Sequence, residues 1–593
     1  MTEFICNIQD RNYTTYQPQH ITNPYIHKIF DRDKILINSC DNIQIIDSPY
    51  RNTHIHGVLI LEKNKTFGKY SNKFYYKCIP ECKKLPIFLV PYEIKNSFST
   101  KYINKYVLFK FDNWDDKYPK GLLVETFGDI TNYNCYRDYY LSYLNLNISI
   151  HEFTNHLKPK KNETNNVDNM NINININIKN IYDKNNVVNI IEKYSVIDET
   201  NKYVFTIDGM DTTDFDDAIS IQVLEKDVHY ILCIHISNVP IILNELNLWH
   251  LIQRVSTIYL PNEKYHMLPK ILSENICSLK KDNNRFVFTF KIEIKNNEII
   301  NTDFYNSYIK IRKNFIYDSV ELLNSNEYQQ ILYYVNKLNS DKPLIMNKLY
   351  TINNSHDLIA YLMILMNYYS AICIIPCGIY RNCEIKNKND KQNIANNDNK
   401  QNDSHQNTTI NHELTNFLMY YENINSEYST INKSHDVLNL KSYIHITSPI
   451  RRIVDIINMY KIQVSLNLFD KNNIVECEKF YEKWTNDIKN INISFKNIKK
   501  IQNKCLLLHC CLNNNNDDKE YDCYIIEKNI VQNNLQNNLQ NNIYKYLIYV
   551  NELKLITSIK SNNDYEMLTK YACKIFIFNE ENLIYNKIKV KII

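Results

Sequence analysis

The chain is poor in glycine and carries little net charge. Only six glycines occur among 593 residues, and four of them lie in the strand-rich N-terminal region, while Gly209 follows the first aspartate of an acidic cluster and Gly378 ends an apolar run. The formal charge of +4 is too small to indicate nucleic-acid binding by itself, and any basic surface must be local. Composition therefore leaves the functional class open, and the local motifs have to decide it.

Two further signals are missing. The sixteen cysteines are scattered along the chain and form no complete zinc motif, and Cys510 and Cys511 are adjacent. The first ten residues include acidic side chains and no apolar run typical of a secretory signal. These features predict reduced thiols and a cytoplasmic protein, with the nucleus as the alternative compartment.

One apolar run, from Leu358 to Tyr380, is long enough to raise the question of a membrane span. Asn367 and Pro376 interrupt it, and several tyrosines add polar groups. The run therefore predicts a buried core helix that ends near Pro376, and no membrane partner.

The densest chemical signal is a cluster of five aspartates within ten residues. They are Asp208, Asp211, Asp214, Asp216 and Asp217. The apolar run before them and the alternating pattern after them predict a strand on each side. Crowded carboxylates raise one another's pKa unless a cation neutralises them, and an oxygen-only donor set suits Mg²⁺ or Mn²⁺ better than zinc. A solvated acidic turn is the plainer alternative. A calcium loop counted from Asp208 fails, because Ile219 would stand where a Glu is needed.

The chain divides by composition into five parts of an α+β multidomain protein. We expect an N-terminal segment at 1–50, small β-barrels at 51–157, an Asn-rich linker at 158–196, a mixed α/β domain at 197–512 with a low-complexity insertion at 386–412, and a last strand-rich domain at 513–593.

Several motifs follow one another in a fixed order through the mixed α/β part. They are Thr206-Ile-Asp208 with Asp214-Phe-Asp-Asp-Ala218, His235-Ile-Ser-Asn-Val239, Arg254 to Pro261, Met267-Leu-Pro269, Cys277-Ser-Leu279, and Tyr443 to Arg452 with Asp455. In this order they resemble the catalytic RNB domain of the ribonuclease II superfamily, over about 197 to 510. His435 and His445 also fit the family spacing, and His235 and His445 are expected to be structural.

The flanking segments look most like the eukaryotic branch of that family, the exosome catalytic subunit and its cytoplasmic relatives. Phe88 to Tyr92 and the stretch from Phe111 to Asp129 resemble a cold-shock domain of that branch. The C-terminal strands fall where an S1 domain would lie. Both would be OB-type barrels, which hold single-stranded RNA by stacking and a basic groove. No room is left before residue 50 for the branch's endonuclease domain, so we expect a monomer that does not join the exosome.

The resemblance implies a processive exoribonuclease that hydrolyses single-stranded RNA from a free 3′ end to nucleoside 5′-monophosphates. Its expected cofactor is Mg²⁺, with Mn²⁺ as an alternative. The metal ligands would be Asp208, Asp214, Asp216 and Asp217, and the catalytic residues Asp216 and Arg451. The residues expected to contact RNA are Tyr259, Tyr317, Arg451 and Arg452, although Arg452 could instead pair with Asp455.

The chain also departs from the family pattern. The family has a Glu just before the Met-Ile of the apolar helix, and Ala360 to Leu362 offers none. Asn238, Ile453 and Met459 also replace the usual residues. Because that Glu helps recognise the terminal sugar, ribose selectivity is open. The alternatives are a catalytically inactive RNA-binding protein of the same fold, and an endonuclease or DNA nuclease.

Overall fold

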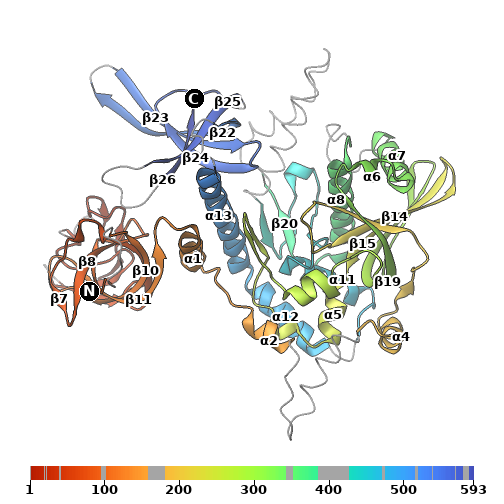
Figure 1. Ribbon diagram of the computed structural model, residues 1–593, viewed down its shortest axis with the longest axis horizontal. Helices are drawn as coiled ribbons and strands as arrows, with labels where there is room; N and C mark the ends of the chain where they lie inside the picture. The colour runs from red at the N-terminus through yellow and green to blue at the C-terminus, as the bar shows by residue number, and fades with distance from the viewer. Residues whose placement is uncertain are drawn as a thin grey trace, which may run out of the picture. The chain divides into compact units, whose positions relative to one another are not determined.

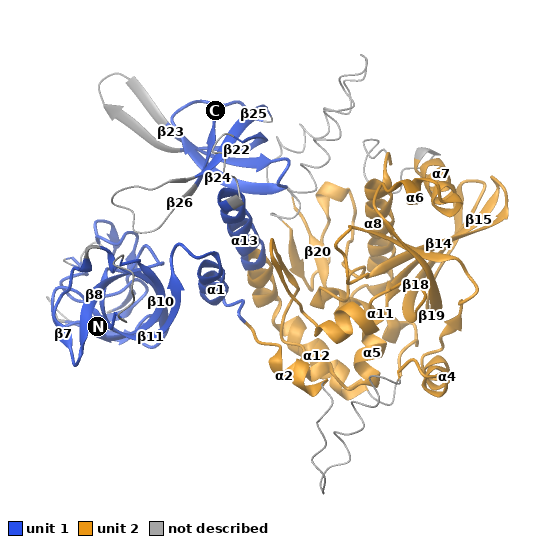
Figure 2. Ribbon diagram, viewed as in Figure 1, with its two compact units in different colours: residues 1–147, 497–593 blue, residues 148–496 orange. Residues whose placement is uncertain are grey.

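The computed structural model divides into two compact units, 1–147 with 497–593, and 148–496 (Figure 2). It describes residues 2–593 except 19–20, 22, 39–41, 95–101, 158–180, 342–351, 385–425, 471–473, 514–518, 537–538, 568 and 579–586. Most of the expected Asn-rich linker and all of the expected insertion at 386–412 therefore lie outside the described residues.

The first unit opens with a closed β-barrel. Pairing runs in the order β6-β10-β11-β9-β8-β7, and a further β6–β8 pairing closes five of these strands into a ring. The strands are β6 (His54–Leu59), β7 (Lys69–Tyr70), β8 (Lys73–Pro80), β9 (Phe88–Tyr92), β10 (Lys105–Asn113) and β11 (Lys120–Asp129), and α1 (Tyr133–Tyr143) follows. The barrel expected in 51–157 is confirmed.

Residues before 50 also form strands, although their sequence shows no clear pattern. The strands β1 (Thr2–Ile5), β4 (Lys34–Asn38) and β5 (Asn42–Asp47) make a small antiparallel sheet, and β2 (Asn7–Ile8) pairs with β3 (Tyr16–Gln17). Ile8, Phe30 and Ile35 share one buried core with Val107 and Phe109 of β10. The N-terminal segment is therefore part of the barrel's core.

The C-terminal strands form a five-stranded antiparallel sheet in the order β24-β23-β22-β25-β26, which is close to a barrel (Figure 1). They are β22 (Glu520–Gln536), β23 (Leu539–Val550), β24 (Leu555–Ser561), β25 (Lys570–Phe578) and β26 (Lys587–Ile592). The long helix α13 (Ile488–Asn513) leads into the sheet, and its Leu506 and Leu507 pack against the sheet's core.

The second unit is built on a six-stranded mixed sheet, in the order β12-β19-β13-β14-β15-β18. β19 runs parallel to β12 and β13, and the other pairs are antiparallel. The strands are β12 (Ile197–Asp198), β13 (Val204–Asp208), β14 (Asp217–Glu225), β15 (His229–Ser237), β18 (Asn284–Lys295) and β19 (Glu298–Ile316). Short pairs β16 (Ile258–Leu260) with β17 (Glu263–Tyr265), and β20 (Tyr380–Asn382) with β21 (Glu427–Ser429), lie outside this sheet.

The α-helices described wholly within this unit are α2 (His151–His156), α4 (Lys184–Lys193), α5 (Val239–Glu245), α6 (Val320–Leu323), α7 (Asn326–Asp341), α8 (Ser355–Ile374), α11 (Ile453–Ser465) and α12 (Ile474–Asn486). Those that carry residues of the sheet's large core are α6, α7, α8 and α11. Side chains of α7 and α8 share the core with the sheet's phenylalanines and isoleucines.

α8 is the apolar run of the sequence. Within the described ranges it is the single helix long and apolar enough to cross a membrane. Leu358, Leu362 and Leu365 are fully buried in the core of the second unit, which is the place expected of a core helix. The helix ends at Ile374, two residues before Pro376.

Candidate active site

Two neighbouring strands place the aspartate cluster. β13 is buried up to Ile207 and ends at Asp208, and β14 begins at Asp217 and returns antiparallel beside it. The connecting loop carries the other three aspartates at the same end of the sheet. Asp214 and Asp216 are buried, whereas Asp211 is exposed. The strand, cluster, strand arrangement predicted from the sequence is confirmed.

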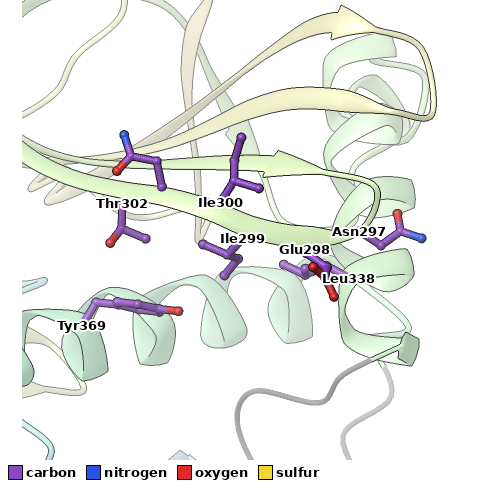
Figure 3. Close-up of a pocket in the computed structure, with 8 residues that line it drawn as sticks. Asn297, Glu298, Ile299, Ile300, Thr302, Leu338 and Tyr369 are labelled. Carbon is purple, nitrogen blue, oxygen red and sulfur yellow. The ribbon is translucent and has the colours of Figure 1, made fainter.

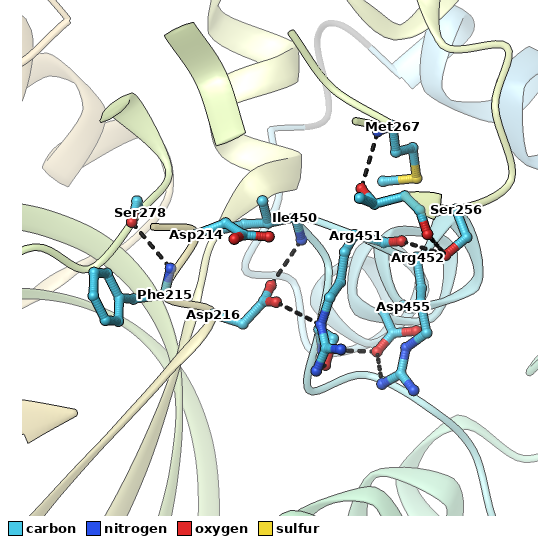
Figure 4. Close-up of polar contacts among 12 residues, drawn as sticks. Asp214, Phe215, Asp216, Ser256, Met267, Ser278, Ile450, Arg451, Arg452 and Asp455 are labelled. Carbon is cyan, nitrogen blue, oxygen red and sulfur yellow. Dashed lines mark hydrogen bonds and ion pairs between the residues drawn. The ribbon is translucent and has the colours of Figure 1, made fainter. Parts of the chain in front are cut away.

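A loop far along the chain meets Asp216. The Asp216 Oδ1 atom accepts a hydrogen bond from the Ile450 amide at 2.9 Å, and Oδ2 pairs with the Arg451 guanidinium Nε at 3.2 Å (Figure 4). Arg451 is 235 positions away in sequence and keeps 44% of its side chain exposed. The guanidinium is therefore held against the acid cluster and is still open to a ligand.

Arg452 makes a different contact from its neighbour. Its NH2 group donates to Oδ1 of the fully buried Asp455 at 2.8 Å, and the Ser448 amide donates to the same oxygen. The pair anchors the loop at the start of α11. The structural pairing with Asp455 that the sequence left open is thus present, and an RNA contact by Arg452 stays a prediction.

Tyr259 lies beside the cluster on β16. Its hydroxyl donates to Asp214 Oδ2 at 2.8 Å. Lys264, the cross-strand partner of Tyr259 on β17, places its ammonium 3.6 Å from Asp214 Oδ1. Lys264 was not among the residues predicted from the sequence. The signal was the short spacing between Tyr259 and Lys264, which allows a hairpin that returns the lysine to the tyrosine.

Tyr317 follows the end of β19, beside the end of β13. Its amide donates to the Asp208 carbonyl at 3.0 Å. Its ring is stacked on the imidazole of His356, with centroids 3.8 Å apart and planes inclined by 13°. His356 also escaped the sequence analysis, because no sequence pattern joins the end of β19 to the first turn of α8.

Burial and mutual repulsion make these carboxyls hard to ionise. Burial is the largest cause, and neighbouring aspartates add to it while Arg451 opposes it. The pKa of Asp208 and of Asp216 is raised to about 7, and the pKa of Asp217 to about 8. The pKa of Arg451 is raised by the surrounding carboxylates, so it stays charged. Near neutral pH, a further positive charge beside the cluster would therefore favour the ionised carboxylates.

The donor set fits a hard divalent cation. All candidate ligands are carboxylate oxygens, and Asp208 Oδ2 is buried with no hydrogen-bond partner among the described residues. In the described part of the chain, however, no three His, Cys, Asp or Glu side chains converge as a ready ligand group. Asp214 and Asp216 direct oxygens at Tyr259, Ile450 and Arg451 instead. A cation would therefore compete with these donors for the same oxygens.

Two residues of the motif from His235 to Val239 are packed into the fold, and one of them, Asn238, departs from the family pattern. Asn238 caps α5, donates to Asn306 and accepts from Gln463 in a buried network. His235 is buried between Ser220 and Thr289, as expected of a structural histidine. These residues hold the sheet and helices together and do not contact the cluster.

A hollow of about 540 Å³ lies elsewhere in the same unit (Figure 3). The turn between β18 and β19 covers α8 there, and Tyr369 and Leu338 form part of the wall. None of the predicted site residues lines it, so the hollow does not belong to the aspartate cluster.

Part of the second unit matches a known protein family. Residues 196–332 and 322–467 match the RNB domain family. Ribonuclease R of Thermotoga maritima is 36% identical over 126 residues, 21% of this chain and 18% of that protein. Ribonuclease R of Chlamydia pneumoniae is 27% identical over 310 residues, 43% of this chain and 45% of that protein. The matched segments thus span less than half the length of these curated relatives.

Two solved structures have a similar fold. Mycoplasma genitalium RNase R, solved in complex with ribose-methylated single-stranded RNA, has a TM-score of 0.62 at 16% identity, covering 100% of both chains. Yeast Ssd1, described as a pseudonuclease, has a TM-score of 0.54 at 12% identity, covering 97% of this chain and 81% of that one. At these identities the likeness shows the fold. That the flanking segments resemble the eukaryotic branch of the family most closely stays a prediction.

Proposed function

We propose that this chain, which carries an RNB domain of the ribonuclease II/R superfamily, is a Mg²⁺-dependent 3′-to-5′ exoribonuclease. It would hydrolyse single-stranded RNA processively and release nucleoside 5′-monophosphates. The observation that carries the proposal is the ion pair between Arg451 and Asp216, which joins a permanent cation to four clustered carboxyls. Phosphodiester hydrolysis needs both a cation for the phosphoryl oxygens and carboxylates to hold metal.

Each residue then has a defined task. Arg451 is planar and always charged, and its exposed fraction lets it take two oxygens of the scissile phosphate. Tyr259 holds Asp214 in place through its hydroxyl. Asp208, Asp214, Asp216 and Asp217 would hold Mg²⁺ or Mn²⁺, which lowers the pKa of bound water and neutralises phosphoryl charge when present. One of these carboxylates would orient the attacking water.

The proposed partner is single-stranded RNA with a free 3′ end. The RNA-bound Mycoplasma genitalium relative supports this choice, as do the barrel and the near-barrel at the two ends of the chain. Tyr259, Tyr317, Arg451 and Arg452 are the proposed RNA contacts. We further propose that the protein is a monomer and acts in the cytoplasm, with the nucleus as the alternative compartment.

The test uses the full chain with single-stranded RNA, labelled at its 5′ end to follow shortening and at its 3′ end to follow the released nucleotides, in Mg²⁺, Mn²⁺ or EDTA. We expect stepwise shortening from the 3′ end and mononucleotide products with either metal, and none with EDTA. Asp216→Asn should abolish release while RNA binding persists. Asp211→Asn is the matched control, because Asp211 belongs to the same loop and is exposed. Equal activity of Asp216→Asn and wild type would refute the proposal.

The second candidate is a catalytically inactive RNA-binding protein of the same fold. The observation in its favour is that Arg451, Ile450 and Tyr259 occupy oxygens of Asp216 and Asp214, so that no ready ligand group is formed in the described residues. It predicts RNA binding without mononucleotide release under any divalent ion. Internal cuts, or degradation of DNA in a parallel reaction, would instead indicate the endonuclease or DNA nuclease.

A further inference from the structure

We propose that His356 is a substrate-contacting residue, on whose exposed imidazole the base of the 3′-terminal nucleotide stacks. This inference rests on the proposed function, because it places the end of the RNA beside the aspartate cluster. It assigns a specificity role to a residue that lies outside the motifs of the sequence.

The ring pair is joined directly to the acid cluster. The Tyr317 amide is hydrogen-bonded to the Asp208 carbonyl at 3.0 Å, so the tyrosine is held at the end of β13. Burial and the nearby Asp217 and Asp208 raise the pKa of Tyr317, which places its phenol beside those carboxyls. His356 lies flat on the same ring at 3.8 Å. The imidazole therefore extends an aromatic surface outward from the site.

The position of His356 is fixed by the start of α8. Ser355 donates its amide and its hydroxyl to Asp318 Oδ1, at 3.1 and 2.7 Å, and its hydroxyl accepts from the Asp318 amide at 3.0 Å. Asn354 caps the helix through the Asp357 amide. These bonds join the residue after Tyr317 to the residue before His356. The two rings are therefore held together by the backbone on both sides as well as by their own contact.

The exposure of the two rings decides which of them can receive a base on this side. Tyr317 is partly buried and has one face covered by the imidazole, whereas His356 is exposed. A base that approaches this side therefore meets His356 first. Unpaired bases stack readily on histidine and other aromatic rings, and the contact tolerates any base because every base has a π-face.

The geometry of α8 gives a second reason to place the terminal nucleotide at His356. His356 and Ala360 are four residues apart on α8, so they share one face of the helix. The ribonuclease II resemblance expects a carboxylate for the terminal sugar within Ala360 to Leu362, and the chain has none there. One turn earlier, His356 offers ring nitrogens that can donate or accept a hydrogen bond. It therefore supplies both a stacking surface and a polar group on that face.

The test measures stacking directly and does not depend on hydrolysis. Full-length protein in EDTA is titrated into single-stranded RNA that carries 2-aminopurine as its 3′-terminal base, and fluorescence quenching is followed. A second RNA carries the probe at its 5′ end. His356→Ala is compared with His356→Phe, which keeps a flat ring, and with His151→Ala, a control at another exposed histidine. Thermal melting checks that every variant is folded.

We expect His356→Ala to lose most of the 3′-terminal quenching and to weaken binding by about tenfold, the order of one stacked base. His356→Phe should stay within about twofold of wild type, and His151→Ala should match wild type. The 5′ probe should respond alike in all variants. Unchanged 3′ quenching in His356→Ala would overturn the inference, and so would equal losses in the Ala and Phe variants.

The two proposals can fail separately. Normal RNA degradation together with unchanged 3′ quenching in His356→Ala would sink the role of His356 and leave the exoribonuclease standing. Loss of quenching in His356→Ala, with no mononucleotide release under any metal, would sink the enzyme and leave the stacking role standing. In an active enzyme, His356→Ala should raise KM and leave kcat within about threefold, as expected for lost binding.

Discussion

Divalent metal should stabilise the second unit, which carries the aspartate cluster, strongly at pH 8 and hardly at pH 5. In the folded protein the pKa values of Asp208 and Asp216 are raised to about 7 and that of Asp217 to about 8. In the unfolded chain they return to about 4. The folded state therefore holds these protons more tightly, and stability without metal falls as the pH rises from about 4 to about 8.

The expected rise in Tm on metal binding follows from the raised pKa values and from the length of the second unit. One pKa raised by about three units corresponds to roughly 4 kcal/mol as an upper limit, and coupled groups do not add. Mg²⁺ at 100 times its Kd would stabilise the fold by about 2.7 kcal/mol. Residues 148–496 form a unit of roughly 350 residues, for which 1 kcal/mol shifts Tm by about 1.4 °C. We expect a rise of about 4 °C at pH 8.

Thermal melting with Mg²⁺ or with EDTA, between pH 5 and pH 9, checks this expectation. At pH 5 the carboxyls keep their protons, which the metal must displace, so the shift should fall below about 1 °C. Asp217→Asn removes one repelling charge. It should raise Tm in EDTA at pH 8 and leave it unchanged at pH 5. Asp211→Asn should behave as wild type. A metal shift of equal size at both pH values, or none at pH 8, would refute the electrostatic reasoning.

Three substitutions separate chemistry from stability. Arg451→Lys should lower kcat/KM for RNA about 100-fold with little change in Tm, because an ammonium cannot match the guanidinium's two-point contact with phosphate; a small kinetic effect would exclude that contact. Tyr259→Phe should raise KM about tenfold, because Asp214 loses the hydrogen bond from the Tyr259 hydroxyl; the rate is measured over a range of RNA concentrations. Unchanged kinetics would show that this hydrogen bond does not contribute to activity. Arg452→Ala should lower the free energy of unfolding by about 3–5 kcal/mol in urea, because the buried Asp455 loses its partner; an unchanged midpoint would contradict that role.

The local sequence pattern predicted those elements whose formation depends mainly on residues close together in the chain. The two strands around Asp208 and Asp217, the N-terminal barrel and the buried apolar helix were all predicted, because alternation and apolar length are read from adjacent positions. The motif order predicted the RNB domain, and family spacing brought Arg451 and Asp216 into one hypothesis. The strands before residue 50 were missed, since the core that stabilises Ile8 and Ile35 is supplied by Val107 and Phe109.

The amino-acid sequence by itself determined that a dense group of carboxylates would end one strand and begin the next, and that this group needs positive charge. Only the tertiary structure shows that the Arg451 guanidinium supplies positive charge to this group, because Arg451 lies 235 positions from Asp216 in the sequence. It also decided that Arg452 turns to Asp455, and that His356 covers Tyr317. The contacts of Arg451 with Asp216 and of His356 with Tyr317 join elements that meet only after the sheet and its helices have packed, whereas Arg452 and Asp455 are three residues apart and the sequence had left their pairing open.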